Sequence, residues 1–106
     1  MIALFKPPET AVETSHNGPV TDLCLRLYIR QRTPEAKAAL SQLHALLEST
    51  DVTYELQVLD VSNNRELALE DQVPFTPLLV RRSPSPIRWI TVPQQNSDEL
   101  RDEILS

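Results

Sequence analysis

Apolar and polar side chains alternate between Leu23 and Ile29, with Leu or Ile at every second position. A period of two is typical of a β-strand that buries one face. The other face of this strand carries Arg26 and Tyr28. The pattern therefore predicts a strand with one apolar face and one partly polar face.

A helix and a second strand are predicted after this alternation ends. Thr33 suits a helix N-cap, and Pro34 suits the first helical position, where a backbone N–H is not needed. Apolar residues then recur at helical spacing, namely Ala36, Ala39, Leu40, Leu43, Leu46 and Leu47. The segment Tyr54–Val61 is rich in Leu and Val and predicts the second strand. A strand, a helix and a strand in this order form a right-handed crossover with parallel strands.

A short helix is predicted next. Ser62 or Asn63 is suited to cap it, and Asn63 with Glu66 three residues later resembles a capping box. Pro74 and Pro77 prevent the helix from continuing beyond this region.

A hairpin and a last helix complete the pattern. Strands are predicted at 78–81 and 87–92, antiparallel to each other around the glycine-free turn Ser83-Pro84-Ser85-Pro86. Asn96 or Ser97 is expected to cap the last helix. Leu100 and Ile104 lie on its apolar side.

The elements from residue 22 to 106 follow the order βαβαββα, which is that of a single thioredoxin-like α/β domain. Thr76 and Pro77 directly precede a strand, where a thioredoxin-like fold has its cis-proline, so we expect this bond to be cis. Residues 1–21 hold three of the nine prolines and no sustained period. They predict a flexible N-terminal arm.

Composition narrows the classes of function. The formal net charge of −5 argues against nucleic acid as a partner, because phosphate binding favours a basic face. No apolar stretch approaches the ~20 residues of a membrane span, and the N-terminus lacks the apolar segment of a signal peptide. We therefore expect a cytoplasmic protein. A single glycine excludes Gly-rich phosphate loops.

Candidate chemistry is sparse. The single cysteine, Cys24, excludes an internal disulfide and a Cys-x-x-Cys pair, and its position within a strand favours a structural thiol over a nucleophile. His16 and His44 do not form a metal-ligand spacing. A turn or capping role is favoured for Asp60 over a general base, because no partner such as His is evident. We expect no catalytic residue, cofactor or metal.

Arg81, Arg82, Arg88 and Trp89 flank the proline turn and are the candidate partner-binding residues. One interpretation is solvated charge on a hairpin. The other is a protein-binding edge, because Arg pairs with carboxylates and also stacks on other side chains. Trp89 is interpreted either as a core residue or as an anchor for a partner. If Arg81 and Arg88 bind a partner, both should be exposed.

Several short motifs occur in a familiar order: Leu25-Arg26-Leu27-Tyr28-Ile29, Thr33-Pro34, Val58-Leu59-Asp60-Val61, Leu67-Ala68-x-Glu70-Asp71, Thr76-Pro77-x-Leu79 and Pro84-x-Pro86-Ile87-Arg88. With them, the segment from Leu25 to Ile90 resembles the KaiB family of cyanobacterial-type clock proteins. Arg32-Thr33-Pro34 and Glu55-Leu56-Gln57-Val58 are similar to the KaiB-like sensory domain that opens SasA-type histidine kinases.

The resemblance implies a domain without enzymatic chemistry that binds the ATPase ring of KaiC. It also implies two possible folds, the thioredoxin-like one and the KaiB ground-state order βαββααβ, between which KaiB switches. Arg81 and Arg88 fall where KaiB carries basic residues used in complex formation. Thr76 and Pro77 fall in the region that changes structure. Asn63 departs from the family, which usually has Lys there.

The function predicted from the sequence is therefore a non-enzymatic protein-binding module of a circadian-clock or related signalling system. Its expected partner is a KaiC-type ATPase, and its expected state is a monomer or weak homo-oligomer. One alternative is a redox protein of the thioredoxin superfamily. The other is a structural or oligomerising domain without an ATPase partner.

Overall fold

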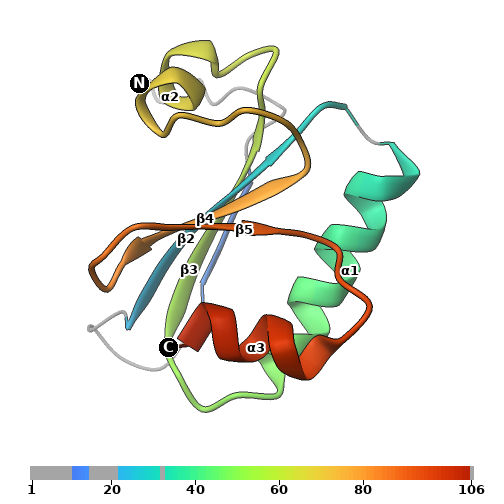
Figure 1. Ribbon diagram of the computed structural model, residues 1–106, viewed down its shortest axis with the longest axis vertical. Coiled ribbons are helices and arrows are strands. Elements are labelled where there is room, and N and C mark those ends of the chain that lie inside the picture. The colour runs from blue at the N-terminus through green and yellow to red at the C-terminus, as the bar shows by residue number, and fades with distance from the viewer. Residues whose placement is uncertain (1–10, 15–21, 32, 106) are drawn as a thin grey trace, which may run out of the picture.

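The computed structural model describes residues 11–14, 22–31 and 33–105, and these form one mixed sheet with three helices (Figure 1). In chain order the elements are β1 (Ala11–Thr14), β2 (Leu23–Ile29), α1 (Pro34–Glu48), β3 (Tyr54–Asp60), α2 (Arg65–Glu70), β4 (Leu78–Ser83), β5 (Arg88–Thr91) and α3 (Ser97–Leu105). From β2 onward this is the order that the sequence predicts.

The five strands lie in the order β1-β3-β2-β4-β5. β2 and β3 are parallel, and α1 connects them as the predicted crossover. β4 is antiparallel to β2, and β5 is antiparallel to β4 and lies at the edge of the sheet. The predicted crossover and the predicted hairpin are both confirmed.

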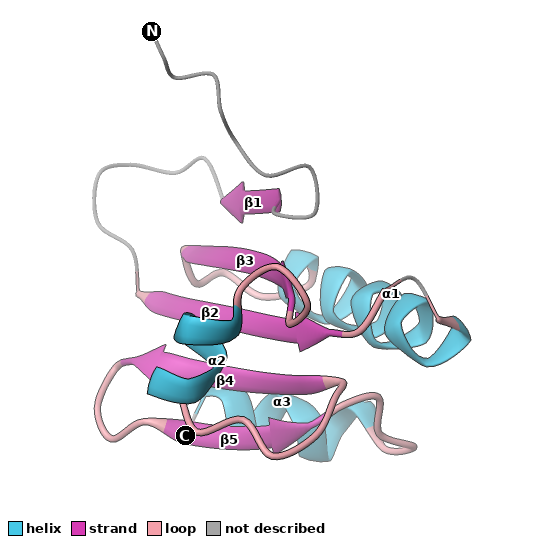
Figure 2. Cartoon of the chain, turned by 90° about the horizontal axis from the view of Figure 1, so that it is seen from above, coloured by secondary structure: helices cyan, strands magenta, loops and turns pink. Residues whose placement is uncertain are grey.

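The helices cover the two faces of the sheet unequally (Figure 2). α1 and α3 pack on one face, where their apolar sides meet the Leu and Ile side chains of β2 in the main core. The shorter α2 covers part of the opposite face, over a smaller cluster of Tyr28, Leu59, Leu78 and Val80. The alternation seen in the sequence of β2 therefore divides its side chains between two separate cores.

Local capping explains where the longer helices begin. The Thr33 hydroxyl accepts a hydrogen bond from the Ala36 amide at 3.1 Å, and Pro34 occupies the first helical position. Asn96 caps α3, because its Oδ1 accepts hydrogen bonds from the amides of Asp98 and Glu99 at 2.9 and 3.2 Å. These bonds satisfy amides that have no partner within the helix.

The capping box predicted for α2 is wrong. The N-cap is Asn64, and its side chain makes no capping hydrogen bond. Asn63 lies instead in a turn, where its amide donates to the Asp60 carbonyl at 3.0 Å. The side-chain amide of Asn64 (Nδ2) also donates to that carbonyl, at 2.9 Å. These residues therefore belong to the turn after β3, and the helix begins only at Arg65.

The N-terminal arm contributes one regular element. Ala11–Thr14 form β1, which pairs antiparallel with β3 from Val58 to Glu55. Residues 1–10 and 15–21 lie outside the described residues. The domain boundary at residue 22 stays a prediction.

Among the described residues, four X–Pro peptide bonds are cis, namely those before Pro77, Pro84, Pro86 and Pro93. None of the helices in the described part of the chain is long and apolar enough to cross a membrane.

Candidate functional site

The four residues proposed as partner-binding do not share one surface. In the hairpin, Arg81 lies opposite Arg88, and Val80 lies opposite Trp89. Residues directly opposite each other point to the same face, and successive residues alternate. Arg81 and Arg88 therefore belong to the α1/α3 face of the sheet, whereas Arg82 and Trp89 belong to the α2 face.

Arg81 is buried, with 1% of its surface exposed, so the expected exposure of this residue is wrong. Its Nη1 donates to the Ile104 carbonyl at 3.0 Å, and its Nη2 donates to the Pro86 carbonyl at 3.2 Å. Ile104 lies in the last turn of α3, where carbonyls lack a partner within the helix and a positive charge is favourable. Burial lowers the pKa of Arg81, and the like charge of Arg88 lowers it further. In this conformation Arg81 holds α3 against the hairpin.

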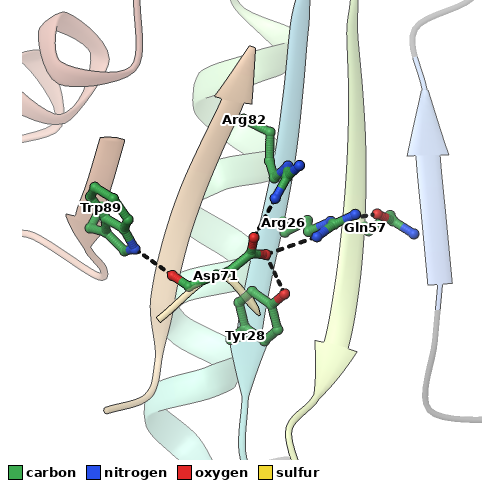
Figure 3. Close-up of polar contacts among 6 residues, drawn as sticks. All are labelled: Arg26, Tyr28, Gln57, Asp71, Arg82 and Trp89. Carbon is green, nitrogen blue, oxygen red and sulfur yellow. Dashed lines mark hydrogen bonds and ion pairs between the residues drawn. The ribbon is translucent and has the colours of Figure 1, made fainter. Parts of the chain in front are cut away.

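The centre of the α2 face is the carboxylate of Asp71, whose side chain is 1% exposed (Figure 3). Its Oδ2 accepts hydrogen bonds from the Tyr28 hydroxyl at 2.5 Å and from the Arg26 Nη1 at 2.9 Å. Its Oδ1 accepts a hydrogen bond from the Arg82 guanidinium. Arg26 also donates to the Gln57 side chain at 3.2 Å. One buried anion therefore joins β2, β4 and the end of α2.

These contacts set the protonation of the cluster. Burial alone would raise the pKa of Asp71, but hydrogen bonds from Tyr28 and Arg26 and the Arg26 charge hold it below its usual value. Burial and the hydrogen bond to Asp71 raise the pKa of Tyr28. Burial lowers the pKa of Arg26, but its contacts with Asp71 outweigh this and leave it raised. At neutral pH the cluster thus holds an ionised Asp71 carboxylate, a neutral Tyr28 phenol and a charged Arg26 guanidinium.

Trp89 is both fixed and exposed. Its indole Nε1 donates to the backbone carbonyl of Asp71 at 2.7 Å, while 48% of the residue surface remains exposed. Phe75 is 53% exposed, and with Trp89 it lines a groove of about 320 Å³. The remaining residues of this groove are Gln72, Pro74, Leu78 and Thr91. Neither side of the core-or-anchor alternative describes Trp89 fully, because it is oriented by the buried cluster and still open to solvent.

Asp60 and Cys24, the other residues considered for chemistry, are not part of the cluster around Asp71. The Asp60 carboxylate accepts hydrogen bonds from the amides of Gln31 and Ser62 at 3.0 and 2.8 Å, which is the turn role that the sequence favours. Cys24 is a free, partly exposed thiol on β2. Within the described ranges, no group of three or more His, Cys, Asp or Glu side chains is placed to hold a metal ion.

Sequence reasoning did not identify Asp71, Arg26 and Tyr28 as a cluster. The signal was partly visible, since the alternation places two long polar side chains, Arg26 and Tyr28, on the second face of β2. Their partner is 45 and 43 positions away in the chain, so no local pattern reveals it.

The arrangement of sheet and helices is that of a thioredoxin-like domain, and solved structures support this class. The N-terminal domain of SasA from Synechococcus elongatus matches with a TM-score of 0.65 and 22% identity, over 83% of this chain and 84% of that one. A mutant thioredoxin from Halobacterium salinarum matches with a TM-score of 0.65 and 24% identity, over 79% and 73% of the two chains. The predicted thioredoxin-like fold is confirmed, and the alternative order βαββααβ is not the one in this structure.

The sequence comparison identifies the family. The KaiB domain model matches residues 26–103, so this chain belongs to the KaiB family. The circadian clock oscillator protein KaiB of Prochlorococcus marinus is 39% identical over 67 residues, which cover 62% of this chain and 59% of that protein. KaiB of Thermosynechococcus vestitus is 36% identical over 77 residues, which cover 72% and 71% of the two. The chain thus spans less than two thirds of the length of the first of these relatives.

Proposed function

We propose that this chain is a protein-binding module of a clock-type signalling system and that its partner is a KaiC-type ATPase. Membership of the KaiB family supports the clock context, because the curated relatives are circadian clock oscillator proteins. The thioredoxin-like fold is shared with the N-terminal domain of SasA.

The observation that carries the proposal is the orientation of Trp89. An exposed aromatic side chain that is held in one orientation loses little conformational entropy when a partner covers it. The hydrogen bond to the Asp71 carbonyl supplies this orientation, and Asp71 is itself held by three side chains. Trp is also among the residues that contribute most to protein interfaces. Trp89 and Phe75 are therefore proposed as the apolar centre of the binding surface.

One arginine, Arg82, is proposed to complete this surface. The Arg82 guanidinium pairs with Asp71, yet 37% of its side chain remains exposed and accessible to a partner carboxylate. Arg88 is exposed on the opposite face of the hairpin, so it is a separate candidate for partner contact outside the surface of Trp89 and Phe75. Arg81 is not proposed to contact the partner directly, since its guanidinium is buried against α3.

The test is capture of a purified KaiC-type ring by the immobilised chain, with and without ATP. The matched variants are Phe75→Ser and Trp89→Ala, and the control is Leu105→Ser, an exposed apolar residue on α3. We expect each of the two groove variants to weaken capture by about tenfold or more, which corresponds to about 1.4 kcal/mol. The control should bind as the unmodified chain does.

Two results would overturn the proposal. Failure of the unmodified chain to bind the ring in either nucleotide state would show that a KaiC-type ring is not its partner. Undiminished capture by both groove variants would show that Trp89 and Phe75 do not form the binding surface. Melting curves of all variants confirm that any loss of capture is not loss of folding.

The thioredoxin-like fold itself favours one second candidate, a redox protein. Thiol–disulfide exchange by this fold uses a dithiol pair, and the chain has one cysteine, with Thr33-Pro34 at the start of the helix after β2. We expect the rate of insulin reduction in the presence of dithiothreitol to stay at the background rate. A rate clearly above background that is lost in Cys24→Ser would favour the redox function.

A further inference from the structure

A second groove lies on the α2 face, at the carboxyl ends of the parallel strands β2 and β3. It has a volume of about 480 Å³ and is lined by Arg30, Val61, Arg65, Ala68, Leu69 and Val73, among others. Arg30 directly follows β2, Val61 directly follows β3, and Arg65 is the first residue of α2. In α/β folds this end of the strands is where ligands tend to bind.

The two arginines of this groove differ from those of the buried cluster. Arg26 and Arg82 both pair with the carboxylate of Asp71, whereas Arg30 and Arg65 are exposed and form no ion pair with any described carboxylate. Asp60, at the end of β3, directs its carboxylate oxygens to the amides of Gln31 and Ser62. Two positive charges therefore stand beside this groove on a chain with a formal net charge of −5.

The rest of the groove is apolar. Leu69 is 78% exposed, the most exposed of the large apolar residues in the described part of the chain. Val61, Ala68 and Val73 are partly buried and pack on the small core below α2, so they form a firm floor. Water in contact with this surface is released when an apolar side chain covers it, which favours binding.

We propose that this groove binds an acidic segment of a partner protein that also carries Leu-like side chains. Its carboxylates pair with Arg30 and Arg65, and its apolar side chains cover Leu69 and Val73. A bare phosphate would use only the arginines, whereas such a segment uses both kinds of lining. The inference rests on the proposed role as a protein-binding module and adds the chemistry of the segment that it binds.

The groove of Arg30 and Arg65 adjoins the groove of Phe75 and Trp89 through the chain between them. Val73 lines the first groove, and Gln72 and Pro74 line the second. One partner surface can therefore contact both grooves, with apolar side chains at Trp89 and an acidic segment at Arg65. This continuity favours a protein segment over a free small anion.

The test is a nuclear magnetic resonance titration of the full-length, isotope-labelled chain with blocked peptides. The probe is a short peptide of alternating Asp and Leu, and the control peptide has Asn in place of every Asp. We expect the probe to shift the amide signals of residues 61–73 and the side-chain signals of Arg30 and Arg65. The Asn peptide should bind at least about tenfold more weakly.

Charge reversal gives the sharper result. The double variant Arg30→Glu with Arg65→Glu should lose binding of the Asp-Leu probe by at least about tenfold and gain binding of a Lys-Leu peptide. Arg65→Glu alone gives the same direction if the double variant does not fold. The matched control is Arg101→Glu, an exposed residue of α3, which should bind the probe as the unmodified chain does.

With the peptides and variants alone, three results would overturn the inference. They are no shifts up to millimolar probe, equal binding of the Asp and Asn peptides, and an equal loss of probe binding in Arg101→Glu. Inorganic phosphate that displaces the probe would assign the groove to small anions instead. If the ring is captured equally well by the double variant, the groove inference fails and the proposed function stands. If the probe binds and the ring does not, the proposed KaiC-type partner is wrong, whereas the groove inference is supported.

Discussion

The substitution Asp71→Asn tests whether the buried cluster around Asp71 stabilises the α2 face of the sheet. The variant keeps the size of the side chain and removes its charge. Arg26, whose side chain is 20% exposed, then loses the carboxylate that neutralises it, and the Tyr28 hydroxyl loses an ionised acceptor. Removing one member of a buried ion pair costs about 3–5 kcal/mol, because an uncompensated charge is left behind.

This cost in stability is smaller where the paired side chains are exposed to solvent. The Arg82 side chain is 37% exposed, so water screens its attraction to Asp71 and this pair contributes about 0–1 kcal/mol. Arg26 is mostly but not fully buried, which places its share near the lower end of the range. We therefore expect Asp71→Asn to lower the free energy of unfolding by about 3 kcal/mol.

The assay is urea unfolding at neutral pH, followed by the fluorescence of Trp89, the single tryptophan of the chain. The midpoint should fall while the slope with denaturant stays unchanged, because the area exposed on unfolding is the same. Asp51→Asn, an exposed loop residue, is the control and should change stability by at most about 0.5 kcal/mol.

The pH dependence gives a second measure with a defined sign. The folded-state pKa of Asp71 is lowered, so its contribution is fully present above the unfolded-state value of about 3.9 and is lost as pH falls through the folded value. The difference between the unmodified chain and Asp71→Asn should therefore shrink below about pH 4. A variant within about 0.5 kcal/mol of the unmodified chain, or a difference that stays constant in acid, would refute this account of the cluster.

Three further outcomes are expected. Arg81→Met should lower the melting temperature by roughly 10 °C or more through loss of its bonds to the Ile104 and Pro86 carbonyls, whereas exposed Arg88→Met should leave it nearly unchanged; equal effects would contradict the burial argument. Tyr28→Phe should cost about 1–2 kcal/mol in urea unfolding, and a neutral result would remove its hydroxyl from the cluster. Light scattering at several concentrations should show a monomer or weak dimer, and a stable tetramer at micromolar protein would contradict this.

Local patterns in the sequence determined most of the fold. The alternation in Leu23–Ile29 and the Thr33-Pro34 helix start both depend on residues a few positions apart, and the structure has both where they are predicted. The apolar pair Leu100 and Ile104 is buried as expected. Such elements are predictable because backbone periodicity and capping are short-range properties.

Tertiary structure alone decided the candidate site. The register of the β4–β5 hairpin places Arg81 and Arg88 together on one face, and the packing of α3 over that face buries Arg81. The ion pair of Arg26 with Asp71 joins residues 45 positions apart, and it forms because the end of α2 lies over β2. Trp89 is oriented by a hydrogen bond to the carbonyl of the same Asp71. No local sequence pattern therefore distinguishes Trp89 from an ordinary core or surface tryptophan. The energy of a buried charge depends on which groups surround it in space, and the linear order of residues does not specify that.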